Sequence, residues 1–134
     1  MNIMEIQNVQ YAYDGKKNVL KGINAQMELG KMYAILGPSG CGKTTLLSLL
    51  GGLDSPSSGQ ILYQGEDIAK TGLANHRRSH VAFIFQSYNL IDYLTPMENV
   101  ALTSKLPPLP ILEQLGLTAE EAKRNVLKLS GGQQ

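Results

Sequence analysis

Cysteine is scarce in this sequence, and charge of either sign is not concentrated anywhere. A single cysteine, Cys41, among 134 residues excludes an internal disulfide and a zinc site built from several thiolates. Twelve Lys and Arg residues balance 11 Asp and Glu residues without forming a basic or acidic block, so we expect no nucleic-acid partner. The longest apolar runs, Met32–Leu36 and Val81–Phe85, fall far short of the ~20 residues of a membrane span.

The first 30 residues have the pattern of a small antiparallel β layer. Apolar and polar side chains alternate along Ile23–Leu29, which is typical of a half-buried strand. Ile3–Val9 is its expected neighbour, and the pair Asp14-Gly15 supplies a turn between them.

The two fully apolar runs differ from these alternating segments. Met32–Leu36 and Val81–Phe85 are apolar on both faces, which predicts strands of a parallel sheet covered by helices on both sides. Thr44–Leu50 is predicted to be a helix that ends at two glycines, and Ile61–Tyr63 a short strand. The fold class expected is therefore α/β.

The chain is predicted to be helical from Thr95 onward. Thr118 and Glu121 have the spacing of a capping box. Ala122, Val126 and Leu129 then recur on one face of a single predicted helix.

A phosphate-binding loop joins the first apolar run to the following helix. Residues 37–44, GPSGCGKT, fit the pattern G-x-x-x-x-G-K-[ST] in its required context. Glycines let the backbone amides turn toward phosphate oxygens, Lys43 supplies a mobile positive charge, and the Thr44 hydroxyl can bind Mg²⁺. The alternative is a glycine-rich turn with an ordinary surface lysine. Cys41 is interpreted as a small space-filling residue.

Together with two later motifs, this loop makes the chain resemble the ATP-binding subunits of ABC transporters. Gln86 ends the second apolar run, as the Q-loop glutamine of that family does, and Leu129–Gln134 matches the family's LSGGQ motif. The resemblance implies a P-loop NTPase core at 31–86, preceded by the antiparallel layer at 1–30 and followed by a shortened helical subdomain at 87–134.

The resemblance also implies roles for individual residues. Lys43 and Gln86 would be catalytic, and Thr44 and Gln86 would contact Mg²⁺. Tyr13 would stack on adenine, with Tyr11 as an alternative, although a strand-end aromatic can simply pack on its neighbour. The residues expected to bind nucleotide are Tyr13, Gly37, Pro38, Ser39, Gly40, Cys41, Gly42, Lys43, Thr44, Thr45, Ser130, Gly131, Gly132 and Gln133.

The partners implied are ATP with Mg²⁺, a second copy of the chain arranged head to tail, and separate membrane subunits. Such subunits would hold the chain on the cytoplasmic face of the membrane and dock near residues 87–100, whose apolar side chains could instead cover the helical subdomain. The loop at 52–59 and Ile61 resemble the branch that serves lipoprotein release and macrolide or peptide export.

The sequence departs from the family pattern after the Q-loop. No aliphatic run is followed by Asp-Glu, the switch histidine is not found after Gln86, and His76 and His80 are expected at the surface. In the family, the acidic pair lies on a C-terminal strand that is followed by a further strand. Because both strands are missing here, we expect exposed sheet edges, marginal stability or self-association, and little ATPase activity. The alternative function is a nucleotide-binding or dimerising module without turnover. A P-loop kinase or GTPase is opposed by the LSGGQ motif.

Overall fold

Alternating side chains along the N-terminal segment build the two longest strands of the computed structural model. β1 (Asn2–Ala12) pairs antiparallel with β2 (Asn18–Glu28), as predicted; β1 extends beyond its predicted bounds at both ends, and β2 begins earlier than predicted but ends at Glu28. β1 also pairs antiparallel with β3 (Ser58–Tyr63), and β3 pairs with the short β4 (Glu66–Asp67). The sheet order is β2-β1-β3-β4.

The structure describes all residues from Met1 to Gln134, and they divide into two compact units. The first unit is Met1–Phe83 and the second is Ile84–Gln134. We describe each unit by itself. None of the helices is long and apolar enough to cross a membrane.

An irregularity at Asn8 bends the middle of β1. Asn8 has a φ of 48°, and the pairing register of β1 shifts between Ile6 and Val9 against β2 and between Gln7 and Gln10 against β3. Gly59 of β3 crosses so near that a Cβ on it would lie 2.3 Å from the main-chain oxygen of Asn8. Only a glycine at this position allows the two backbones to approach so closely.

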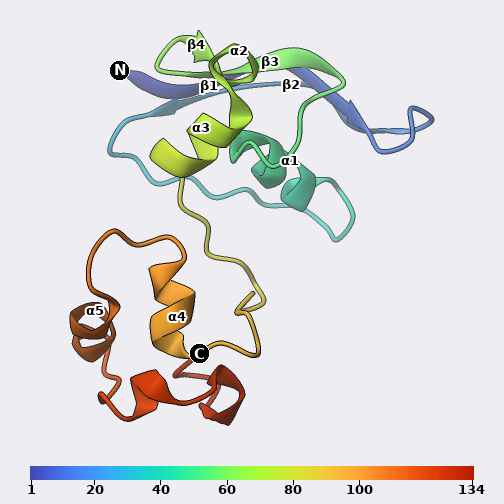
Figure 1. Cartoon of the computed structure of the whole chain (residues 1–134). Coiled ribbons are helices and arrows are strands. Elements are labelled where there is room, and N and C mark those ends of the chain that lie inside the picture. The colour runs from blue at the N-terminus through green and yellow to red at the C-terminus, as the bar shows by residue number, and fades with distance from the viewer. The chain divides into compact units, whose positions relative to one another are not determined.

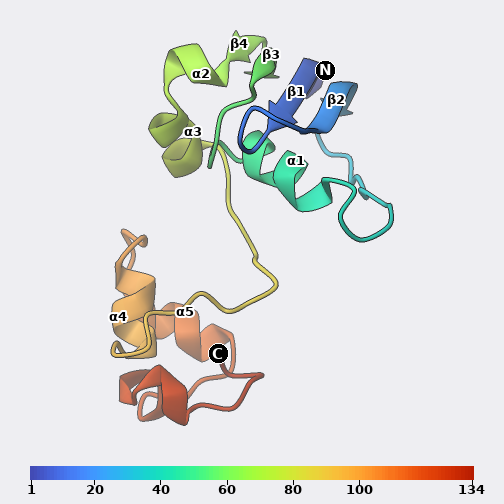
Figure 2. The ribbon, with the colours of Figure 1, turned by 90° about the vertical axis from the view of Figure 1, so that its right-hand side faces the viewer.

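Helices of the first unit lie beside this sheet. α1 (Lys43–Leu50) and α3 (Leu73–Ser79) lie on the same side of it in Figures 1 and 2, and α2 (Ile68–Thr71) leads into α3. The buried core joins strand and helix residues: Ile6, Val9, Tyr11, Leu20, Leu49, Leu50, Ile61 and Ile68.

The prediction of two parallel strands is wrong. Met32–Leu36 and Val81–Phe85 are not strands in the structure, and Figure 1 draws both as uncoiled chain. Met32, Leu36 and Ile84 expose their side chains almost fully, at 99%, 88% and 102%. Neither segment pairs with the four-stranded sheet, so neither gains the ladder and the helix cover that a buried parallel strand requires.

The prediction that His76 lies at the surface is also wrong. His76 is completely buried, and its Nε2 lies 3.0 Å from the main-chain oxygen of Leu50. That oxygen belongs to the last turn of α1, where carbonyl groups have no helical partner. The imidazole therefore caps α1 from α3, whereas His80 is exposed as predicted.

The second unit is built from short helices around its own apolar cluster. α4 (Pro96–Ala101) begins with a capping box between Thr95 and Glu98, and α5 (Pro108–Gln114) begins at the proline-rich segment. Two 3₁₀ turns follow, η1 (Glu121–Lys123) and η2 (Val126–Lys128). The buried residues of this cluster are Leu112, Leu117, Ala122 and Leu129.

The end of the chain confirms the predicted burial but not the predicted continuous helix. The Glu121 N–H donates to Thr118 Oγ1, and Glu121 Oε2 accepts from the Thr118 N–H at 2.8 Å, so the capping box is confirmed. The helix then breaks because Asn125 adopts an extended conformation and its side chain accepts from the Leu127 N–H. Asn competes in this way with continued helix.

Candidate nucleotide-binding site

The phosphate-binding loop leads directly into α1. Gly42 is the N-cap residue, with a φ of 97° that only glycine adopts without strain. A Cβ on Gly42 would lie 2.9 Å from Cδ2 of Leu20 and 3.1 Å from Cγ1 of Val19. The loop is therefore held close to the start of β2, and both its conformation and its neighbours require glycine at this position.

Lys43 folds back over the loop. Its Nζ donates to the main-chain oxygens of Gly37 at 2.6 Å and Pro38 at 2.7 Å, and it lies 3.6 Å from Sγ of Cys41. The positive charge is thus held at the centre of the loop, close to the backbone that the motif predicts will surround phosphate.

The first turn of α1 supplies backbone N–H donors and a threonine hydroxyl oxygen next to the Lys43 charge. The first amide groups of a helix have no partner within the helix, and the helix dipole favours an anion there. Thr44 lies exposed in this turn, and Thr45 is buried. An exposed threonine hydroxyl beside a phosphate site fits Mg²⁺, which prefers oxygen ligands and keeps several waters.

A cavity of about 350 Å³ joins the phosphate-binding loop to Tyr13. The Tyr13 hydroxyl lies 2.7 Å from Oγ1 of Thr45, and its ring meets the ring of Tyr11 edge to face at 5.1 Å. The structure therefore brings the predicted aromatic residue to the predicted loop. The residues that line the cavity are Tyr13, Val19, Ser39, Gly40, Gly42, Lys43, Thr44 and Thr45.

Val19 is the cavity residue that the sequence analysis missed. It precedes the buried Leu20 on β2, and strand alternation sends successive side chains to opposite faces. This alternation was the available signal, but it does not reveal that the loop crosses at this end of the strand.

A short hydrogen bond between two ionisable side chains holds Tyr11, the residue that Tyr13 packs on. The Tyr11 hydroxyl donates to Oδ2 of Asp54, and Asp54 Oδ1 accepts from the Ser55 N–H at 2.8 Å. The bond to Asp54, followed by burial, raises the pKa of Tyr11 to about 12. The same bond, followed by that of Ser55, lowers the pKa of Asp54. Asp54 therefore holds the Tyr11 ring against which Tyr13 rests.

The remaining predicted residues belong to the second unit. Gln86 is exposed there, at the start of the segment that leads to α4. The signature residues form a closed turn, in which Gln133 Oε1 accepts from the Ser130 N–H at 3.0 Å and the Gln133 N–H donates to the Ser130 oxygen. Gln133 Nε2 also donates to Oε1 of Glu121 at 2.9 Å. The hydrogen bond from the Thr118 N–H is the largest cause of the lowered pKa of Glu121, and the bond from Gln133 is a smaller one.

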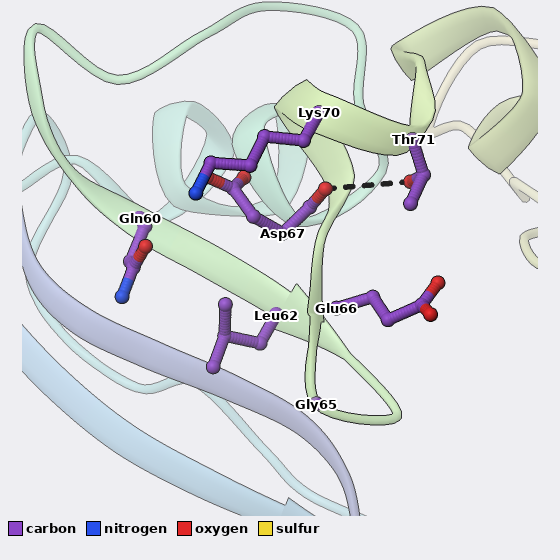
Figure 3. Close-up of a pocket in the computed structure, with 7 residues that line it drawn as sticks. All are labelled: Gln60, Leu62, Gly65, Glu66, Asp67, Lys70 and Thr71. Atoms are coloured by element: carbon purple, nitrogen blue, oxygen red, sulfur yellow. Dashed lines mark hydrogen bonds between the residues drawn. The ribbon is translucent and has the colours of Figure 1, made fainter.

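Another cavity, of about 440 Å³, lies beside β3, β4 and α2 (Figure 3). Its polar groups serve the local turn. Asp67 Oδ1 accepts from the Ala69 N–H at the start of α2, and Figure 3 shows the bond from the Thr71 hydroxyl to the main-chain oxygen of Asp67. We assign it no ligand.

The comparison with protein families decides the identity of the chain. The family model described as ABC transporter matches residues 20–134. The chain belongs to the ABC transporter ATP-binding family. Members of this ABC family bind and hydrolyse ATP, typically with Mg²⁺.

Curated ABC relatives agree with this assignment. An uncharacterised ABC transporter ATP-binding protein of Bacillus subtilis, YclH, is 41% identical over 145 residues, which cover 100% of this chain and 64% of YclH. The spermidine/putrescine import ATP-binding protein PotA of Spiroplasma citri is 41% identical over 142 residues, 98% of this chain and 39% of PotA. The chain thus spans under two thirds of either relative. Because one is named for import, the export branch stays a prediction.

Solved structures confirm the predicted α/β P-loop fold. The dimeric structure of MJ0796, a bacterial ABC transporter cassette, matches with a TM-score of 0.81 and 31% identity, covering 97% of this chain and 64% of that chain. A post-hydrolysis dimer of the same cassette with ADP and phosphate gives a TM-score of 0.80.

Proposed function

We propose that this ABC chain binds MgATP in the cavity between Tyr13 and the phosphate-binding loop. The observation that carries the proposal is the single cavity of about 350 Å³ that Tyr13, Lys43 and Thr44 line together. Tyr13 would stack on adenine, Lys43 would leave the carbonyls of Gly37 and Pro38 to contact the β and γ phosphates, and Thr44 would bind Mg²⁺. Amides of the loop would cradle the phosphates.

The residues of the second unit complete this proposal. Gln86 would contact Mg²⁺ and the attacking water, and the turn at Ser130–Gln133 would face the nucleotide held by a second copy of the chain. The proposal of a head-to-tail dimer is supported by the dimeric cassettes that the chain resembles. Residues 87–100 would dock on separate membrane subunits, which would hold the chain at the inner face of the membrane.

Two directions of transport have support. The resemblance of the loop at 52–59 to the lipoprotein-release and macrolide-export branch supports export or membrane extraction of the substrate. Import of a small polycation is the second candidate, since PotA proteins of several bacteria are 40–42% identical over 98% of the chain. Transport assays in vesicles that contain the chain and its membrane subunits would decide the direction.

The 134 residues on their own would bind nucleotide without steady-state turnover. This part of the proposal rests on the sequence, in which no aliphatic run precedes a pair of acidic residues. An acidic pair is needed to order the Mg²⁺ water shell and to orient the attacking water. Steady-state ATPase activity of the purified chain that Lys43→Ala abolishes would contradict it.

Calorimetric titration with MgATP tests the binding step. We expect saturable binding by the wild-type chain and its loss in Lys43→Ala, with circular dichroism showing that both are folded. Lys31→Ala is the matched control, because Lys31 lies outside the cavity and pairs only with Glu28 at 3.8 Å. Absence of binding by a folded wild-type chain, or equal losses in both variants, would overturn the proposal.

A further inference from the structure

Two histidines on α3 place ring nitrogens side by side at a distance from the nucleotide site. His76 and His80 lie one turn apart, and the His80 N–H donates to the His76 oxygen at 3.0 Å, so helical geometry continues through both. Their Nδ1 atoms are 3.3 Å apart. Tyr63 of β3 stacks on the His80 ring, with ring centroids 4.2 Å apart and planes 12° apart, which holds that ring in place.

The environment of His76 fixes which of its nitrogens is free to bind. Its Nε2 lies 3.0 Å from the Leu50 oxygen, and because a carbonyl can only accept, Nε2 carries the proton. In the neutral ring, Nδ1 then has a lone pair, and it faces His80. Histidines that bind metal ions almost always donate their other N–H to a carbonyl or carboxylate in this way.

The separation of the two nitrogens also suits a metal ion. Zinc bonds to imidazole nitrogen at about 2.0–2.1 Å, so two ligands of a tetrahedral zinc lie about 3.3–3.4 Å apart. The observed 3.3 Å is that spacing, and the rings meet at 65° rather than stacking on each other. To bind, the His80 Nδ1 would give up its proton and the His80 ring would turn against Tyr63 until both Nδ1 lone pairs meet on one ion.

The arginine that follows His76 in the sequence is engaged elsewhere: the Arg77 guanidinium donates to the Gly52 oxygen. Gly52 lies on the Cδ2 side of His76, beside Nε2, because a Cβ on it would be 3.3 Å from Cδ2. No group of three or more His, Cys, Asp or Glu side chains lies here, so imidazole is the only protein ligand type. Imidazole suits Zn²⁺, Ni²⁺ and Cu²⁺, and not Mg²⁺ or Ca²⁺.

We propose that His76 and His80 form a two-imidazole site for a divalent transition-metal ion, bound through both Nδ1 atoms with water as the remaining ligands. The ion would replace the proton that one ring shares with the other. Because His76 caps α1 and Tyr63 belongs to β3, the bound ion would tie α3 to the end of α1 and to the sheet. Two protein ligands predict weaker binding than a four-ligand structural zinc site.

The test is a calorimetric titration of the untagged chain with ZnCl₂ at neutral pH, without nucleotide. Cys41→Ser is the background, because Cys41 is exposed and its thiolate could itself bind zinc. His80→Asn is the decisive variant, since asparagine can place an amide N–H where His80 has Nδ1. It therefore keeps a donor to His76 but removes the metal ligand. Arg78→Ala, two positions from each histidine on the same helix, is the matched control, and MgCl₂ replaces ZnCl₂ as the ion control.

We expect one saturable Zn²⁺ site in Cys41→Ser and in Cys41→Ser/Arg78→Ala, with no binding of Mg²⁺. His80→Asn should lower the affinity by more than the roughly 10–100-fold that loss of an outer-shell partner costs. Zn²⁺ should also raise the thermal unfolding midpoint of the background but not of the His80→Asn variant. A folded background that binds no Zn²⁺, or equal binding after His80→Asn, would show that the pair is only a hydrogen bond. The same titrations with Cys41 retained control for any disturbance of the phosphate-binding loop by the Cys41→Ser substitution.

Discussion

The hydroxyl of Tyr13 lies 2.7 Å from Oγ1 of Thr45, and this bond ties an exposed aromatic ring to the first turn of α1. The ring is 67% exposed, yet it is held between the Thr45 hydroxyl and the edge of Tyr11. The aromatic surface is therefore positioned before any ligand arrives, which reduces the entropy that binding must overcome.

This arrangement separates the role of the ring from that of the hydroxyl. Tyr13→Ala should weaken ATP binding about tenfold, because stacking of a base on an aromatic ring contributes roughly 1–3 kcal/mol. Tyr13→Phe keeps the ring and should lose much less affinity. Tripolyphosphate, which has no base, should bind both variants and the wild type equally in competition titrations. Equal loss of tripolyphosphate binding in Tyr13→Ala would mean that the ring acts on the loop and not on adenine.

Close approach of two strands makes Gly59 the least replaceable glycine of the sheet. In Gly59→Ala the new methyl would lie 2.3 Å from the Asn8 oxygen, at a φ of 80° that disfavours any side chain. We expect a loss of about 3 kcal/mol or more in the free energy of unfolding, measured by urea denaturation. Gly65→Ala is the control, since Gly65 has a φ of 83° but open space around it, and strain alone should cost about 1–2 kcal/mol. Equal losses would contradict the steric explanation.

Stability should depend on pH at both ends of the range through Tyr11 and Asp54. Because the pKa of Tyr11 is raised from 10.0 to about 12, its contribution is complete below pH 10 and is lost as the pH rises through about 12. Because the pKa of Asp54 is lowered from 3.8, its contribution is present above pH 3.8 and is lost as the pH falls through the lowered value.

Tyr11→Phe removes this bond and so isolates its share of the pH dependence. The difference in unfolding free energy between wild type and Tyr11→Phe should be constant from roughly pH 5 to pH 9 and shrink outside that range. Tyr93→Phe, at a side chain that is 82% exposed, should show no such profile. A difference that grows toward alkaline pH would contradict the assignment of donor and acceptor.

Much of the local structure was predictable because it depends on neighbours in sequence. The strand pair, α1 and the capping box of Thr118 follow from alternation, glycine placement and i, i+3 spacing. Met32–Leu36 and Val81–Phe85 were predicted wrongly because a buried parallel strand depends on distant partners, which periodicity does not report. His76 was placed wrongly for the same reason: only the packing of α3 on α1 brings it to the Leu50 oxygen.

The residues of the candidate site also differ in whether they could be predicted from the sequence. The phosphate-binding loop is a continuous motif and could be found from eight residues, whereas Val19 joins the cavity only because β2 passes beside Gly42. Periodicity also could not predict the break after η1, since the break depends on the Asn125 side chain accepting from the Leu127 N–H.

The turn at the signature motif can be tested through one amide. Gln133→Ala removes the acceptor of the Ser130 N–H, so hydrogen exchange of that amide should become faster. Gln134→Ala is the matched control, because the Gln134 side chain bonds the oxygens of Val126 and Leu129 and leaves the Ser130 N–H bonded. Exchange is measured by NMR. Faster exchange of the Ser130 amide in Gln134→Ala but not in Gln133→Ala would show that the Gln134 side chain closes the turn, and that the Gln133 side chain does not.

Apolar side chains in water have a practical consequence for studying this protein. Dyes such as anilinonaphthalene sulfonate become fluorescent on exposed apolar surface, and their binding is commonly taken as a sign of a molten globule. Met32, Leu36 and Ile84 offer such surface in the folded chain. Dye fluorescence will therefore be high before any unfolding begins, and loss of tertiary structure has to be followed by near-ultraviolet circular dichroism of the tyrosines instead.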